Sequence, residues 1–238
     1  MPIDLLAIAA HRDDVELTCA GTLLKARRRG YATGILDLSA GETGTRGSAD
    51  LRAAEAAKAA EVLGVSERRN AGLPDAGLHN TDEMRRVVVE HLRHFRPRTV
   101  ILPYPVGRHP DHRVAAELAR DACFLSGLAK YPASGEAHRP AKILHALAYR
   151  EDPVKPTFVV DISEEFEGKM AAIRCYASQF DGAKAAGEIF PTGQDLYALV
   201  ETQNAHYGSL IRARYGEPFW TPETIAVDDV VTLAVRSM

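Results

Sequence analysis

The sequence predicts an α/β fold: a Rossmann-like, doubly wound, mostly parallel sheet flanked by helices, with a C-terminal extension of strands and helices. Apolar runs of strand length alternate with segments of helical period through the first 130 or so residues. This alternation is typical of parallel strands joined by right-handed helical crossovers. The pattern changes beyond residue 140, which indicates the extension. Because no Pro/Gly/Ser-rich or charge-rich stretch divides the chain, we expect one domain over residues 1–238.

The predicted strands are short apolar runs bounded by turn residues. They are residues 4–9, 31–38, 69–72, 98–103, 143–149 and 157–162. The predicted helices have apolar residues three and four positions apart. They are residues 16–29, 48–63, 81–95, 114–128, 164–180 and 194–215.

End signals support these boundaries. Ser48 or Asp50 can cap the Ala-rich second helix, and Gly64 can end it in a left-handed conformation. Thr81 or Asp82 can cap the third helix in the same way. The first four βα units are therefore expected to follow one another closely.

Composition excludes several classes of protein. The net charge of −3 argues against a nucleic-acid partner. The chain shows no basic leader and no apolar run long enough for a bilayer, so we expect no membrane partner and a cytoplasmic location. Cys19, Cys123 and Cys175 are odd in number and scattered. They are expected to be reduced, buried small hydrophobes and not a disulfide framework or a thiolate metal site.

Two polar clusters follow two of the predicted strands. Residues 10–16 read Ala-His-Arg-Asp-Asp-Val-Glu after the first strand, and residues 108–112 read Arg-His-Pro-Asp-His after the fourth. Ligands of open parallel sheets bind at the carboxyl ends of the strands, where neighbouring connections part to opposite faces. If the strand order is 3-2-1-4-5, the two clusters meet at that switch point.

The clusters hold a candidate metal site made of His11, Asp14 and His112. Two imidazoles and one carboxylate leave open positions for water and substrate, as in catalytic zinc sites. Zn²⁺, one ion per chain, is the expected occupant. Another divalent metal, such as Fe²⁺, is the alternative occupant in the cell. A lone His-x-x-Asp is more often a helix cap or a surface pair, but the pairing of two clusters favours a site.

Three further residues beside the metal predict hydrolytic chemistry. Asp13 diverges from its neighbour Asp14 and can take a proton from the activated water as general base; alternatively it caps the helix that follows. His109 can stabilise the developing oxyanion or protonate the leaving group, unless its role is structural. Asp111 can hold an imidazole in the required tautomer or charge state.

Two other classes of function fit parts of the pattern. Two histidines and a carboxylate also form the facial triad of non-haem Fe(II) oxygenases, but the βα alternation and the spare Asp13 favour hydrolysis. A non-catalytic nucleotide-binding module is less favoured. Its first βα loop lacks the G-x-G-x-x-G pattern and carries carboxylates where a pyrophosphate needs bare amides.

Residues 10–16 and 109–112 together resemble the paired signature of the zinc-dependent N-acetylglucosaminyl deacetylases of the PIG-L/LmbE family. The two motifs are specific together and weak alone. Further segments are similar to the bacillithiol-pathway deacetylases, which act on N-acetylglucosaminyl malate. These segments are residues 41–47, 51–56, 73–75, 108–112, 178–180 and 215–219. The resemblance runs from the first strand to about Phe219, which is nearly the whole chain.

The resemblance implies removal of the N-acetyl group from a small-molecule sugar conjugate, with N-acetylglucosaminyl malate as the expected substrate. A chitooligosaccharide or a mycothiol-like conjugate is the alternative. It also implies zinc on the three predicted ligands, Asp13 as base, His109 beside the oxyanion, and a homo-oligomer, often a hexamer. Arg12 departs from the pattern, because it stands where the family usually has proline; a basic residue there can attract an anionic substrate.

The expected substrate-binding residues are less distinctive. Arg46, Arg52 and Arg108 lie on or just after predicted active-edge loops, and arginine suits bidentate capture of the malyl carboxylates. By composition alone each is a solvated surface charge. Tyr197 can be a mobile hydroxyl donor to the oxyanion. An aromatic group is expected in the core or at a subunit interface, not as a sugar platform: Tyr215, Phe219 and Trp220.

Overall fold

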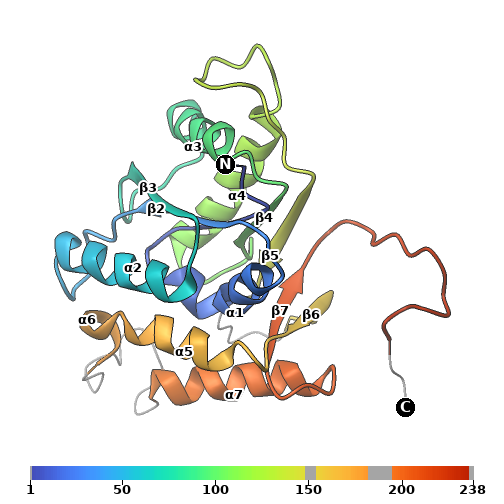
Figure 1. Cartoon of the computed structure of the whole chain (residues 1–238). Coiled ribbons are helices and arrows are strands. Elements are labelled where there is room, and N and C mark those ends of the chain that lie inside the picture. Colours follow the sequence, from blue (N-terminus) through green and yellow to red (C-terminus); the bar gives the residue numbers. More distant parts are fainter. Residues whose placement is uncertain (1, 148–153, 182–194, 236–238) are drawn as a thin grey trace.

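The protein forms a seven-stranded sheet with helices on both faces (Figure 1). It is described here by a computed structural model, which covers residues 2–147, 154–181 and 195–235. The strands are β1 (Leu5–Ala9), β2 (Thr33–Ser39), β3 (Glu67–Leu73), β4 (Thr99–Pro103), β5 (Lys142–Ala146), β6 (Phe158–Asp161) and β7 (Gly216–Trp220). The helices are α1 (Asp14–Arg28), α2 (Ala49–Leu63), α3 (Asp82–Phe95), α4 (Pro110–Leu125), α5 (Phe166–Arg174), α6 (Ala177–Phe180) and α7 (Leu196–Ser209).

The strand order is β3-β2-β1-β4-β5-β7-β6. The first five of these strands are parallel, and β7 runs antiparallel between β5 and β6. β1 pairs with β2 on one side and with β4 on the other. The strand order of the sheet therefore reverses at β1, which is the topological switch point. The predicted fold class and the 3-2-1-4-5 order are confirmed.

The sheet separates two layers of helices (Figure 1), each of which packs on it through an apolar cluster. Successive side chains of a strand point to opposite faces. In β1, Leu6 and Ile8 pack with helices α3 and α4, while Ala7 and Ala9 pack with α1, α2 and α5. Both faces of β1 are therefore buried, which explains why its sequence reads as a continuous apolar run.

Helix caps follow the predicted signals. The Ser48 hydroxyl accepts a hydrogen bond from the Leu51 amide at 3.1 Å, and the Thr81 hydroxyl accepts one from the Met84 amide at 3.3 Å. Gly64 ends α2 with a φ of 60°, a left-handed conformation in which a Cβ is disfavoured. Of the alternative caps, Ser48 and Thr81 are the ones used.

Helix α4 begins four residues before its predicted start at 114. Its N-cap is His109 and its first residue is Pro110. Proline is well suited to this position because it has no N–H to leave unpaired and its φ is already helical. Residues 109–112 thus form the cap and first turn of a helix, and not a loop.

The C-terminal extension differs from the prediction in three places. The expected helix over 194–215 is α7, which already ends at Ser209. The expected helix over 164–180 is two helices, because Tyr176 has the non-helical angles φ −93° and ψ 52°. Residues 216–220, which were not predicted as a strand, form β7. Gly216 and Pro218 lower the strand propensity of this segment, so its strand character comes from pairing with β5 and β6. Parts of predicted elements, residues 148–149 and 194, lie outside the described residues.

A buried ion pair joins β7 to α5. Lys169 Nζ donates to Glu217 Oε1 at 2.8 Å, and both side chains are almost fully buried. Glu217 also accepts from the amides of Gly21 at 2.9 Å and Thr22 at 2.7 Å. These amides are available because α1 is kinked at Cys19, where φ is −146°. Glu217 therefore caps the second half of α1.

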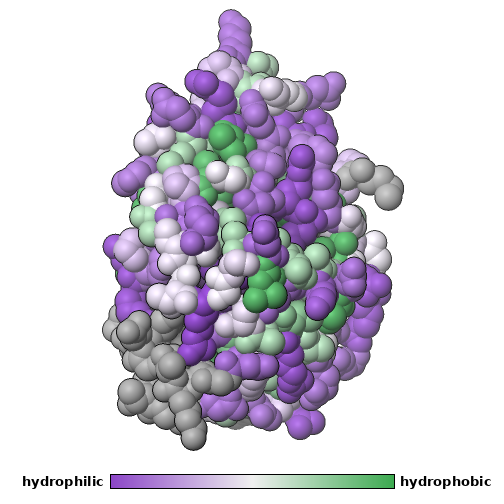
Figure 2. Space-filling view, turned by 90° about the vertical axis from the view of Figure 1, so that its left-hand side faces the viewer, coloured by the Kyte–Doolittle hydropathy of each residue, from purple (hydrophilic) through white to green (hydrophobic). Residues whose placement is uncertain are grey.

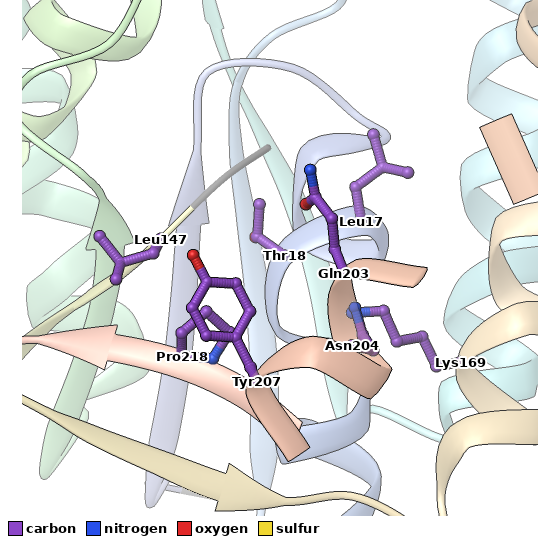
Figure 3. Close-up of a pocket in the computed structure, with 8 residues that line it drawn as sticks. All are labelled: Leu17, Thr18, Leu147, Lys169, Gln203, Asn204, Tyr207 and Pro218. Atoms are coloured by element: carbon purple, nitrogen blue, oxygen red, sulfur yellow. The ribbon is translucent and has the colours of Figure 1, made fainter. Parts of the chain in front are cut away.

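A small cavity lies beside Lys169 of this ion pair (Figure 3). Its volume is about 10 Å³, and Asn204 presents a buried Oδ1 that has no partner among the described residues. A polar cavity of this size can hold about one water molecule. It is lined by Leu17, Thr18, Leu147, Lys169, Gln203, Asn204, Tyr207 and Pro218. The predicted metal ligands are not among these residues.

The surface is largely polar on the face shown in Figure 2, where apolar side chains form small patches separated by hydrophilic ones. Within the described ranges, helices that could span a bilayer are absent. All three cysteines are free; Cys19 and Cys123 are buried as predicted, and Cys175 is half-buried.

Replacing Glu217 by alanine should destabilise the fold strongly. The change leaves the Lys169 ammonium buried without its carboxylate and removes the acceptor of two helix amides. We expect a loss of about 3–5 kcal/mol in the free energy of unfolding, measured by urea denaturation. Glu223→Ala is the control, since Glu223 pairs with Arg120 on the surface and should change stability by about 0–1 kcal/mol. Equal small losses in both variants would contradict the role given to Glu217.

Candidate metal centre

The three predicted metal ligands meet at the carboxyl edge of the sheet. His11 follows β1, Asp14 opens α1, and His112 lies in the first turn of α4. His11 Nδ1 lies 3.4 Å from Asp14 Oδ2, and His112 Nε2 lies 3.2 Å from Asp14 Oδ1. The two imidazole nitrogens are 3.3 Å apart. Two nitrogens and one carboxylate oxygen at this spacing fit a divalent cation with positions left open for other ligands.

A second group of potential ligands shares His11. It consists of His11, His109 and Asp111. Asp111 Oδ2 lies 3.5 Å from Nε2 of His11 and also accepts a hydrogen bond from the Ala76 amide at 2.8 Å. Asp14 lies on the Nδ1 side of the His11 ring, and Asp111 lies on the Nε2 side. Asp111 therefore supports the ring from the side opposite to Asp14.

The far side of the His11 ring is held by a carboxylate that was not among the predicted site residues. Asp75 Oδ1 lies 3.1 Å from His11 Nε2. A carboxylate at the second nitrogen of a ligating histidine fixes its tautomer and orientation. The other oxygen of Asp75 accepts from the Thr43 amide at 2.9 Å and from its hydroxyl at 2.6 Å. Asp75 follows β3 and belongs to the segment 73–75 that resembles the family, so the sequence held two signals for it.

Electrostatics prepare these groups for a cation. Burial lowers the pKa of His11, but the hydrogen bond and charge of Asp14, with the charges of Asp13 and Asp75, raise it to about 9. Burial raises the pKa of Asp14, but His112 and His11 hold it well below its usual range. The pKa of His112 is likewise raised by Asp14 despite burial. In the metal-free protein, a proton on His11 balances part of the Asp14 charge.

Asp13 does not cap α1 through its side chain, although it occupies the N-cap position. Its carboxylate is 3.4 Å from Arg52 Nη2 and is largely buried. Burial and the Asp14 charge raise the pKa of Asp13, whereas Arg52 and His11 lower it. The structure thus gives no support to the capping alternative, and the carboxylate stands beside the candidate ligands.

His109 caps α4 with its ring. Nδ1 accepts a hydrogen bond from the Asp111 amide at 3.2 Å, so the proton of the neutral ring is on Nε2. The ring centroid lies 4.9 Å from those of both His11 and His112. Burial and these two imidazoles lower the pKa of His109. The arrangement favours a neutral imidazole that donates from Nε2.

The predicted substrate arginines have different surroundings. Arg52 is only 5% exposed, so its surface-charge alternative is wrong. Its Nη1 donates to the Gly41 carbonyl at 2.7 Å. A Cβ on Gly41, whose φ is +71°, would lie 2.1 Å from Nη1 of Arg52. Arg46 donates to the Gln179 carbonyl at 3.2 Å, and Arg108 is exposed at the start of α4.

Two other predicted groups also have protein partners. Tyr197 donates its hydroxyl to Asp181 at 3.0 Å, so its proton is not directed to the three candidate ligands. Arg12 donates from Nη1 to the Ala49 carbonyl at 2.7 Å, which ties the first loop to the start of α2. The aromatic residues Tyr215 and Phe219 are in the core, and Trp220 is half-buried.

A buried charge cluster behind the centre had no predicted role. Arg68 Nε and Nη2 hold both oxygens of Asp37 at 2.8 and 2.9 Å, and Nη1 donates to Glu16 Oε1 at 2.6 Å. Burial raises the pKa of Glu16 to about 7 despite the charge of Arg68. Asp37 stands in the middle of an apolar strand, which was the signal in the sequence.

Several known proteins to which this chain is similar in sequence are named as deacetylases. The sequence model of the family described as PIG-L, GlcNAc-PI de-N-acetylase, matches residues 6–123. A diacetylchitobiose deacetylase from Thermococcus kodakarensis is 30% identical over 228 residues, which cover 90% of this chain and 80% of the relative. A 1D-myo-inositol 2-acetamido-2-deoxy-alpha-D-glucopyranoside deacetylase from Rhodococcus jostii is 28% identical, over 58% of this chain and 59% of the relative.

A solved structure extends this likeness to the fold. The crystal structure of the conserved protein TT1542 from Thermus thermophilus matches with a TM-score of 0.85 and 36% sequence identity. The match covers 95% of this chain and 98% of the other. The seven-stranded architecture described above is therefore one already observed in a relative.

Metal affinity should increase with pH. Since His11 is protonated below about pH 9 in the metal-free protein, the cation must displace a proton from it at neutral pH. We expect the apparent Kd for Zn²⁺ to fall about tenfold per pH unit for each proton released, and to level off above the His11 pKa. Chelator-competition titrations at several pH values measure this. A Kd that does not change between about pH 6 and about pH 8 would contradict the assignment of His11 as a ligand.

Arg52→Lys should lower activity on different substrates equally. Lysine keeps the charge but cannot reach both the Gly41 carbonyl and Asp13. Loss of these hydrogen bonds should reduce kcat/KM about 10-fold or more, both for the substrate expected from the sequence, N-acetylglucosaminyl malate, and for plain N-acetylglucosamine. Arg69→Lys, at an exposed arginine, is the control. A loss confined to the malyl substrate would instead support the sequence-based prediction that Arg52 binds a substrate carboxylate.

Proposed function

This chain belongs to the PIG-L family, and we propose on that basis that it is a metal-dependent amide hydrolase that removes the N-acetyl group of an N-acetylglucosamine conjugate. The observation that carries the proposal is the convergence of His11, Asp14 and His112, with the carboxylate of Asp13 beside them and free of any capping role. The deacetylase names of the relatives agree with this chemistry.

The candidate ligands fit one Zn²⁺ ion, and Fe²⁺ satisfies the same nitrogen and oxygen donors. A cation in this site supplies Lewis-acid activation of a water molecule and of the amide carbonyl. The charge of Asp14 between the two imidazoles favours such a cation. Asp75 and Asp111, on the other nitrogen of His11, keep its Nδ1 directed to the site.

Asp13 and His109 have different roles in the reaction. Asp13 accepts a proton from the water that attacks the amide carbon, and it can return that proton to the amine nitrogen when the C–N bond breaks. The products are acetate and the free amine. His109, held by the Asp111 amide with its proton on Nε2, donates a hydrogen bond to the carbonyl oxygen as negative charge develops there.

The proposed substrate is N-acetylglucosaminyl malate. Arg46 and Arg108 are the arginines that we assign to its carboxylates, since Arg52 is committed to Asp13 and Gly41. Diacetylchitobiose is the second candidate, because the relative from Thermococcus kodakarensis matches 90% of this chain. The single domain over 1–238, the homo-oligomer, the cytoplasmic location and the role of Tyr197 remain predictions.

A product assay over a panel of N-acetylglucosamine conjugates tests this function. The panel contains the malyl glycoside, diacetylchitobiose, the inositol conjugate and free N-acetylglucosamine. We expect release of free amine that stops when a chelator removes the metal and returns when Zn²⁺ is added. Preference for the malyl glycoside supports the specific substrate. Activity that required oxygen and a 2-oxoacid would instead indicate the oxygenase chemistry that the same ligand set can support.

Asp13→Asn should separate catalysis from metal binding. The amide keeps the shape of the carboxylate but cannot take a proton, so we expect kcat to fall about 10²- to 10⁴-fold while the metal content stays at the wild-type level. His112→Ala is the contrasting variant, which should lose the metal itself. Metal analysis and steady-state kinetics on the same preparations measure both. Near-normal turnover in metal-replete Asp13→Asn would remove Asp13 as the base.

A further inference from the structure

The backbone carbonyl of Arg12 receives two side-chain donors. Nη2 of Arg68 and the hydroxyl of Tyr176 both donate to it. Arg12 stands between His11 and the Asp13–Asp14 pair, so its carbonyl belongs to the peptide group that leads into the proposed base and the carboxylate ligand. The orientation of this peptide decides where the next two side chains point.

Both donors are themselves fixed. The Arg68 side chain is 8% exposed and is held by Asp37 and Glu16. Tyr176 is fully buried between α5 and α6. Its hydroxyl also lies 3.1 Å from Glu16 Oε1, but one hydroxyl proton serves one acceptor at a time, and the Arg12 carbonyl is the nearer. The donors therefore come from β3 and from the α5–α6 junction, both distant from α1 in sequence.

We propose that Arg68 and Tyr176 are positioning residues of the metal centre, which hold the Arg12 carbonyl and thereby set the directions of Asp13 and Asp14. Neither residue touches the metal or the substrate in this role. The inference deepens the proposed function, because it rests on the same metal site, and it assigns a part in that site to residues that the ligand set does not contain.

The physical reason lies in the loop itself. Residues 10–13 join β1 to α1 without regular structure. The His11 amide donates to Asp14 Oδ2 at 2.9 Å across this loop, but the side chain of Asp13 forms no capping hydrogen bond. The Arg12 side chain is tied at its far end to the Ala49 carbonyl. With its backbone carbonyl held by Arg68 and Tyr176, Arg12 is fixed at both ends. The loop is thus ordered before a cation arrives, which lowers the entropy cost of binding.

Tyr176→Phe tests the proposal with the loss of one oxygen atom. We expect the Kd for Zn²⁺, measured by competition with a chelator, to rise about 10-fold, as is usual when a group that supports a ligand is removed. In the metal-reloaded variant, kcat should fall more than KM rises, since Asp13 is displaced. Amide hydrogen exchange over residues 11–14 of the metal-free variant should be faster than in the wild type.

Tyr215→Phe is the matched control. Tyr215 packs in the same apolar cluster as Tyr176 and is also buried, but its hydroxyl donates to Glu201 at 2.8 Å. This variant should lose a comparable amount of thermal stability and keep the wild-type Kd, kcat and exchange over residues 11–14. Arg68→Lys keeps the charge while it loses the planar fork, and should weaken zinc binding at least as much as Tyr176→Phe.

The outcomes separate this inference from the function it rests on. Tyr176→Phe that folds, binds Zn²⁺ with the wild-type Kd and shows unchanged exchange would overturn the inference and leave the function intact. If the wild type bound no metal, the proposed function would fall, and the exchange measurement would still decide whether Tyr176 orders the loop. If Arg68→Lys did not fold, the comparison of Tyr176→Phe with Tyr215→Phe would be decisive alone.

Discussion

The parallel pairing of β1 with β4 is the constraint on which the site depends. Ala7 lies opposite Ile101 in this ladder, so the two strands end at nearly the same level of the sheet. His11 lies two residues after the end of β1. His112 lies in the first turn of α4, the helix that follows β4. Because β1 also pairs with β2, the connections after β1 and β4 leave to opposite faces and open the space between them.

Burial of charge is the main cost of this arrangement. His11 and Asp14 are removed from most of the solvent, and so are Glu16, Asp37 and Arg68 behind them. Burial alone would neutralise the carboxylates, but each one faces an imidazole or a guanidinium. A cation at the centre would offset the Asp14 charge more fully than a proton on His11 does, because it can contact all three ligand atoms.

Four residues outside the first βα unit tie the loops around the centre to it. Asp75, after β3, links Thr43 to His11. Arg52, on α2, links Gly41 to Asp13. Arg68, on β3, and Tyr176, between α5 and α6, both donate to the Arg12 carbonyl. The candidate ligands therefore sit on strand ends and helix starts, and their supports come from elements that the first βα unit does not contain.

The sequence by itself determined the order of the elements, the two apolar faces and the meeting of residues 10–16 with residues 108–112, because strand periodicity and the topology of parallel sheets are local or general rules. It also contained an unused signal, since Pro110 after His109 is suited to the first position of a helix. Only the tertiary structure decided the rest. The strand β7, the capping role of His109, the burial of Arg52 and the support from Asp75, Arg68 and Tyr176 depend on contacts between residues far apart in sequence. Their strength comes from burial and accurate placement of the partner, which no local pattern of residues encodes.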